Sequence, residues 1–155
     1  MAADAYRALA RRWFDSVSYR EGLARAMQYG DPKIAREAFF RILIGEIFSP
    51  VCVMHFPDRD GNVDRILRYH LVMMDAFPDL SSEIDDMIAE GDRVAVRGRL
   101  QGTNTGPFQG RPPTGKRVTM GFITICRVHQ GQIAETWGYN DMAGFLRQLG
   151  IRPAL

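Results

Sequence analysis

The chain of 155 residues is 46% hydrophobic and 25% charged, the composition of a globular protein long enough to bury a sizeable core. Its net charge is only +2 and its arginines are scattered, which excludes the basic patches typical of nucleic-acid or membrane-surface binding. We see neither an apolar stretch of membrane-spanning length nor a signal peptide, so we expect a cytoplasmic protein. Cys52 and Cys126 lie in apolar runs outside any Cys-x-x-Cys pair, which indicates buried thiols in a reducing compartment.

The first third of the chain is predicted to be helical. Apolar residues recur at three- and four-residue spacing over 6–17, continue more weakly over 23–27, and stop at Gly30. Asp31 followed by proline is typical of a capped helix start, and the next apolar stripe covers 34–43.

A short strand and a third helix are predicted next. Residues 48–56 form an apolar, β-like run, and 57–62 form a polar turn. The helix has an apolar side over 66–77, which includes His70, and Pro78 ends it because proline has no amide hydrogen.

The rest of the chain is predicted to be mainly antiparallel sheet. Four strands and a closing helix are expected at 83–89, 93–103, 118–128, 132–139 and 142–149. Residues 104–116 are rich in Gly, Pro and Thr, so we expect a long irregular connection, of the kind that often forms the rim of a site. Helices followed by an antiparallel meander predict an α+β fold, in which a strongly bent sheet would leave a cavity against the helices.

Six segments then carry a family resemblance. They are Ala-Phe-Pro-Asp-Leu at 76–80, and the segments at 89–97, 102–108, 112–116, 131–137 and 141–150. Their order and spacing resemble the SnoaL-like polyketide cyclases, within the nuclear-transport-factor-2-like superfamily. The resemblance covers 46–150, follows a helical start at 1–45, and predicts a single domain over 1–155.

This resemblance implies a conical α+β barrel, with N-terminal helices packed on a bent, mostly antiparallel sheet around one pocket, often in a homodimer. It also implies antibiotic biosynthesis, since the best-known members close a ring in aromatic polyketides by intramolecular aldol condensation without metal or organic cofactor. Such chemistry needs a base that removes a proton from the carbon next to a carbonyl group. It also needs a polar group that stabilises the resulting enolate oxygen. A metal site is not expected from the residues either, because the histidines are dispersed along the chain.

The last strand departs from the family pattern. Family cyclases carry an acid/base aspartate there, two residues after a histidine, and a second histidine on the preceding strand. Here the matching positions are Gly138, Thr136 and Thr124. None of these residues is a carboxylate base, so the usual mechanism does not carry over.

Two residues are the candidate acid or base, each with a structural alternative. His55 follows an apolar run where the family often has a histidine near the pocket mouth; otherwise it is a hydrogen-bonded histidine at a strand end. Asp141 is the carboxylate nearest the vacated position; otherwise it is the N-cap of the closing helix, which we favour. His129, in a turn, is expected to be solvated.

The other candidates are substrate-binding residues with polar, aromatic or adaptable side chains. They are Asn104, Thr124, Tyr139, Asn140, Trp137, Met74, Phe77 and His70. For His70 a core position is the favoured alternative, and the asparagines are also common turn and cap residues.

The sequence therefore predicts a cofactor-independent, cyclase-like enzyme that acts on an apolar, oxygenated small molecule by proton transfer. The alternative is a non-catalytic protein that holds a small molecule in the same pocket, which the missing acid/base pair favours. A third reading is a dimeric interaction module with Arg97 and Arg99 on the outer sheet face.

Overall fold

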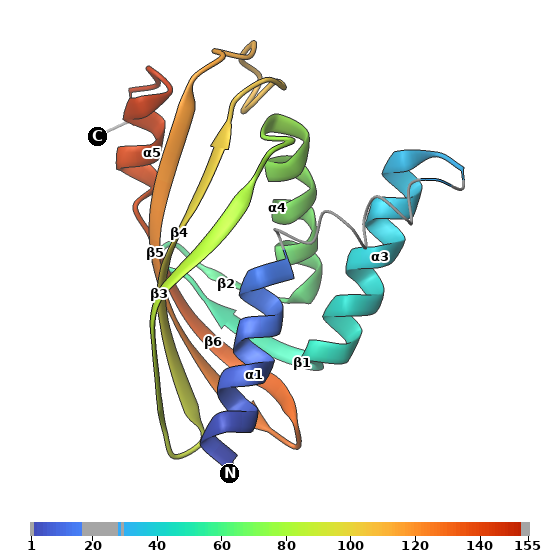
Figure 1. Cartoon of the computed structure of the whole chain (residues 1–155), viewed down its shortest axis with the longest axis vertical. Coiled ribbons are helices and arrows are strands. Elements are labelled where there is room, and N and C mark those ends of the chain that lie inside the picture. Colours follow the sequence, from blue (N-terminus) through green and yellow to red (C-terminus); the bar gives the residue numbers. More distant parts are fainter. Residues whose placement is uncertain (1, 17–27, 29, 153–155) are drawn as a thin grey trace.

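The computed structural model describes residues 2–16, 28 and 30–152 (Figure 1). The expected continuation of the first apolar stripe over 23–27, and its residue Val17, lie outside the described residues. The described elements are α1 (Ala2–Asp15), α3 (Pro32–Ile47), β1 (Phe48–His55), β2 (Asp60–Gly61), α4 (Val63–Ala76), β3 (Ser81–Glu90), β4 (Arg93–Thr103), β5 (Arg117–His129), β6 (Gln132–Asn140) and α5 (Met142–Gln148). None of the helices in this part of the chain is long and apolar enough to span a membrane.

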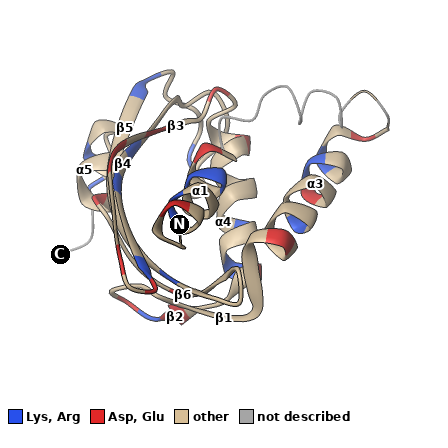
Figure 2. Cartoon of the chain, turned by 60° about the horizontal axis from the view of Figure 1, so that its bottom comes forward, with Lys and Arg blue, Asp and Glu red and all other residues tan. Residues whose placement is uncertain are grey.

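The strands form one six-stranded sheet in the order β2-β1-β6-β5-β4-β3. Every neighbouring pair is antiparallel except β1 and β6, which run parallel. Figure 2 shows that the sheet curves around α1 and α4, while α5 lies outside the curve. The predicted α+β cone is confirmed, but its sheet is not closed, since β2 and β3 are edges. The two residues of β2 lie in the stretch expected to be only a turn.

The helices begin and end at local signals. The Asp31 carboxylate accepts a hydrogen bond of 2.7 Å from the Lys33 amide at the start of α3, as predicted. Helix α4 ends where the amide of Phe77 donates to the Met73 carbonyl (2.8 Å), directly before Pro78. Gly150 has a φ of +79°, the left-handed conformation that stops a helix.

The interior divides into three apolar clusters around the helices. In β4, Val94 and Val96 are fully buried and belong to the cluster that includes Ala10 of α1. Cys52 and Cys126 are buried free thiols, as predicted. Burial raises the pKa of Cys52 to about 11 and that of Cys126 to about 12, so both stay protonated near neutral pH.

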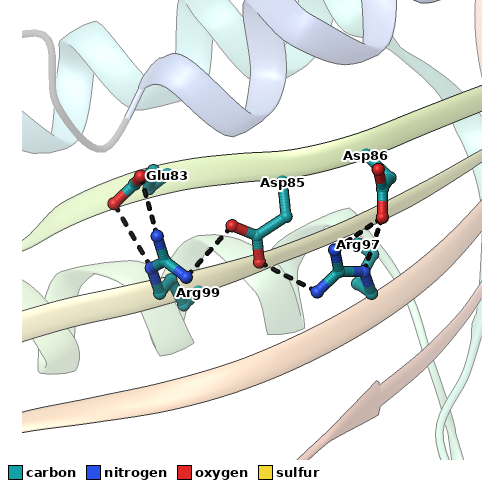
Figure 3. Close-up of polar contacts among 5 residues, drawn as sticks. All are labelled: Glu83, Asp85, Asp86, Arg97 and Arg99. Carbon is teal, nitrogen blue, oxygen red and sulfur yellow. Dashed lines mark hydrogen bonds and ion pairs between the residues drawn. The ribbon is translucent and has the colours of Figure 1, made fainter.

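The outer, convex face of β3 and β4 carries an ion network, shown in Figure 3. Arg99 contacts Glu83 (2.8 Å) and Asp85 (3.1 Å). Arg97 contacts Asp85 (3.2 Å) and Asp86 (2.6 Å). Asp85 lies at a register shift between the two strands and bridges both arginines. The network therefore fastens β3, an edge strand, to β4 across this irregularity.

Candidate functional site

A cavity lies between α1, α4 and the inward-facing side chains of the sheet. It encloses about 90 Å³ of free volume. Its walls are mostly aromatic and aliphatic, with Trp13 and Phe14 from α1 and Phe122 from β5 among them. The polar side chains of the described lining are few: Tyr69, His70, Ser82, Thr124, Thr136 and Asn140. This is the composition of a site for an apolar molecule that carries a few oxygen atoms.

The sheet wall of the cavity contains the positions where the family resemblance places the acid/base residues. Thr124 on β5 pairs directly with Gly138 on β6, and alternation along β6 also turns Thr136 inward. A β-carbon at position 138 would lie 3.7 Å from the Thr124 Oγ1, an ordinary contact distance. A side chain there would therefore enter the cavity, but at these three positions the wall offers only the hydroxyl groups of Thr124 and Thr136.

His70 lines the cavity from α4 and is 8% exposed. Its Nδ1 lies 2.9 Å from the Ile66 carbonyl, so the proton is assigned to Nδ1, which donates to that oxygen. The ring centre is 4.8 Å from that of Trp13 and 5.7 Å from that of Tyr69. Burial lowers the pKa of His70 to about 4, so the imidazole is neutral near pH 7.

Tyr69, the neighbour of His70 on α4, also lines the cavity and was not singled out as a site residue from the sequence. Its hydroxyl oxygen is shielded from solvent and has no hydrogen-bond partner within the described residues. Burial raises the pKa of Tyr69 to about 12, which keeps the phenol protonated. The only sequence signal was its place directly before a histidine on the apolar side of a helix.

His55 lies on the opposite face of the sheet from the cavity. Met54 points inward and is buried, so the alternation of β1 turns His55 outward. Its Nδ1 and Nε2 each lie 2.9 Å from a carboxylate, Asp60 and Glu135 respectively, and its ring stacks on Trp137 at 5.3 Å. The hydrogen bonds that His55 donates to the carboxylates of Glu135, with the larger effect, and Asp60 raise the pKa of His55. The expected place of His55 and Trp137 at the pocket is therefore corrected.

Asp141 has the geometry of an N-cap, which was the structural alternative to a role as acid or base. Its Oδ1 accepts a hydrogen bond of 2.8 Å from the Gly144 amide, as an N-cap of α5 does. Asn140, one residue earlier, lines the cavity and is exposed at its edge. Tyr139, the residue before Asn140, points outward and is 64% exposed, so it does not line the cavity, contrary to expectation.

Asn104 is held away from the cavity under the concave sheet by its own hydrogen bonds. It is 1% exposed and fastens the loop after β4, and it borders a second cavity beside the end of α5. Phe77 is fully buried among other aromatic rings, and Met74 packs between two apolar clusters. Neither lines the cavity under the concave sheet, and Phe77 packs instead against the rings of Phe108 and Phe145.

The structure therefore brings together three of the candidate residues, His70, Thr124 and Asn140, and places the other seven elsewhere. His129 is exposed in its turn, as expected. Within residues 2–16, 28 and 30–152, no group of three or more His, Cys, Asp or Glu side chains is arranged to hold a metal ion.

Comparison with known proteins adds a family and structural neighbours. The model of the SnoaL-like polyketide cyclase family matches residues 43–149. AclR from Streptomyces galilaeus, a proposed hydroxylase, is 28% identical with a TM-score of 0.67, over 90% of this chain and 89% of AclR. IdmH from Streptomyces antibioticus, a proposed polyketide cyclase, is 26% identical with a TM-score of 0.64, over 84% of this chain and 97% of IdmH. The search of curated proteins gave no match.

Proposed function

Because this chain belongs to the SnoaL-like polyketide cyclase family, we propose that it is a cofactor-independent enzyme of secondary metabolism. Its substrate would be an apolar, oxygenated small molecule of the polyketide kind. The reaction would be proton transfer that leads to intramolecular ring closure. One observation carries the proposal: the concave sheet and the helices enclose an apolar cavity in which the polar groups are few and separate.

The cavity lining suits such a substrate. The rings of Trp13, Phe14 and Phe122 offer flat apolar surface to an aromatic or polyene carbon skeleton. The hydroxyl groups of Thr124 and Thr136 are suited to hydrogen bonds with ketone or hydroxyl oxygens. Family membership supports the proposed reaction class, and the lining supports the proposed chemical class of the substrate.

A second candidate function is the binding of a small molecule without turnover. The observation that favours it is the sheet wall, where the positions of the family's acid/base pair are Thr136 and Gly138. A protein that only binds would retain a ligand from its host and release it unchanged. Mass spectrometry of small molecules that co-purify with the protein distinguishes the two functions, since an enzyme also converts the ligand on prolonged incubation.

Filling the cavity tests whether it is the binding site. In Gly138→Leu the new side chain enters the cavity past the Thr124 hydroxyl, because the β-carbon meets only ordinary contacts there. We expect this variant to bind the fluorescent bicyclic probe 2-naphthol at least about tenfold more weakly, or about 1.4 kcal/mol. Gly121→Leu is the matched control, because its β-carbon has no atom within 4 Å and the position is exposed. If folded Gly138→Leu binds 2-naphthol as tightly as the wild type does, the probe binds outside this cavity.

We further propose that the protein is a cytoplasmic homodimer of one domain, residues 1–155, and that its sheet forms the interface. Large hydrophobic side chains are exposed on the outer sheet face: Ile88 (68%), Ile123 (50%), Tyr139 (64%) and Val53 (41%). Exposed apolar groups gathered on one face mark an interaction surface, and a two-fold axis lets this surface cover itself. The ion network beside it is already paired internally, so it does not repel a second copy.

The dimer proposal predicts that Ile123→Arg is a monomer. Each copy would then bury a guanidinium group without a partner in the apolar interface, which is strongly unfavourable. Light scattering after size exclusion measures the mass directly. Ile42→Arg, at a 66% exposed position of α3, should remain a dimer. A monomeric wild type at tens of micromolar would refute the proposal.

A further inference from the structure

The ionisable groups of the cavity lie on α4 and β5, at positions other than those of the family's acid/base pair. Among the described residues that line it, the groups able to exchange a proton are Tyr69, His70 and Cys126, and the lining includes no Asp, Glu, Lys or Arg. Burial raises the pKa of Tyr69 and of Cys126 to about 12, so neither loses a proton near neutral pH. His70 is the group that is left to accept one.

We propose that His70 is the catalytic base of this cavity, and that its Nε2 removes a proton from a carbon next to a ketone of the substrate. The proposal rests on the proposed function and deepens it, because it specifies a substrate with an acidic C–H bond beside a carbonyl group. It also moves the proton-transfer step from the sheet, where the family pattern has it, to the facing helix.

The surroundings of His70 fix both its tautomer and its orientation. The hydrogen bond from Nδ1 to the Ile66 carbonyl (2.9 Å) holds the proton on Nδ1 and leaves a lone pair on Nε2. The rings of Trp13 (4.8 Å) and Phe40 (6.1 Å) contact the imidazole and restrict its rotation. Nε2 has no hydrogen-bond partner in the part of the chain that the structure describes. A base held in one tautomer and orientation is prepared for proton transfer.

The same burial that keeps His70 neutral also opposes its protonation. During the reaction, however, the imidazolium forms together with an enolate anion inside the same apolar cavity. The attraction between these opposite charges is strong at low dielectric and offsets the loss of hydration. The hydroxyl groups of Thr124 and Thr136 are the donors on the opposite wall for the enolate oxygen.

The proposed step balances without a cofactor. The Nε2 lone pair takes the proton of the C–H bond, and the electron pair of that bond forms the enolate. The enolate carbon then attacks a second carbonyl carbon of the same molecule, which forms the ring C–C bond and an alkoxide. The alkoxide takes the proton back from Nε2, so the product is an isomer of the substrate and His70 is neutral again.

Deuterium exchange into 2-tetralone, an apolar ketone with acidic α-hydrogens, tests the base without the natural substrate. Proton NMR in D₂O follows the loss of the α-hydrogen signal. In His70→Asn the amide retains a donor near the Ile66 carbonyl but no base remains, so we expect at least about a 100-fold loss of protein-catalysed exchange. His129→Asn, an exposed turn position, should exchange at the wild-type rate.

The pH profile of wild-type exchange provides a second readout that a structural role would not produce. Because the pKa of His70 is lowered to about 4, the rate should stay level down to about pH 6 and fall only well below the ordinary histidine value. A fall that begins above pH 6.5 would refute His70 as the base, even if His70→Asn does not fold. If Gly138→Leu abolishes the exchange but folded His70→Asn retains it, the cavity remains the site and only the role of His70 as base is refuted. No exchange by the wild type would refute both the base and the proposed enzyme.

Discussion

Asn104→Ala is expected to lower the free energy of unfolding by about 3 kcal/mol, because the side chain is 1% exposed and fully hydrogen-bonded. Its amide nitrogen donates to the carbonyls of Ala76 (3.3 Å) and Gly106 (2.8 Å). Its Oδ1 accepts from the amide (2.8 Å) and the hydroxyl (3.0 Å) of Thr114. Alanine would leave these groups without partners in a place that water reaches poorly. Urea unfolding followed by circular dichroism measures the change.

Two comparisons separate this effect from a general sensitivity of the loop. Thr105→Ala, at the exposed next position, should change the free energy of unfolding by no more than about 0.5 kcal/mol. Asn104→Asp should destabilise at least as strongly as alanine at neutral pH, since a carboxylate would then face the two carbonyl oxygens that the amide contacts now. A wild-type unfolding midpoint for Asn104→Ala would contradict the structural role and return Asn104 to the candidates for substrate binding.

Acidification is expected to remove about 3 kcal/mol of stability through His70 alone. Its pKa is about 4 in the folded protein and about 6.5 in the unfolded chain, and each pKa unit corresponds to about 1.4 kcal/mol. The unfolded chain therefore binds the proton first. The contribution of His70 is complete above about pH 6.5 and is lost as the pH falls towards 4.

The measurement compares wild type and His70→Asn by urea unfolding between pH 8 and 4. Protonation of carboxylates whose pKa is lowered in the folded protein also destabilises it in acid. The difference in stability loss between the two proteins therefore isolates the contribution of the histidine. His55 has the opposite sign, because its folded pKa is raised: its contribution is present below the unfolded value and is lost as the pH rises through the folded one. Equal acid slopes for wild type and His70→Asn would show that the ring is not buried in its neutral form.

Local signals were sufficient to predict most elements from the sequence. The strand predicted at 93–103 coincides with β4, because alternating burial and the turn at 90–92 act within a few residues. The parallel pairing of β1 with β6 could not be predicted from such local signals. It depends on contacts between segments far apart in the chain, and nothing within β1 specifies its neighbour.

The candidate site was predicted less completely, and His55 shows the physical reason. The run over 51–54 is apolar at every position, so alternation does not reveal which of its residues face the core. Pairing with β6 decides that Met54 faces inward and His55 outward. On β5, Thr124 lines the cavity at the position that the family resemblance indicated. Tyr69 was not singled out, because an unpaired buried hydroxyl is a property of three-dimensional packing.

The parallel pair of β1 and β6 also has a kinetic consequence. His55 and Glu135 on these strands are 80 positions apart, whereas β3, β4 and β5 each pair with the next strand along the chain. Closing the long loop costs more conformational entropy, so we expect the four-stranded meander to form early and β1 to join late. The cavity then exists only after the folding barrier is crossed. A bound ligand should therefore slow unfolding while leaving the folding rate nearly unchanged.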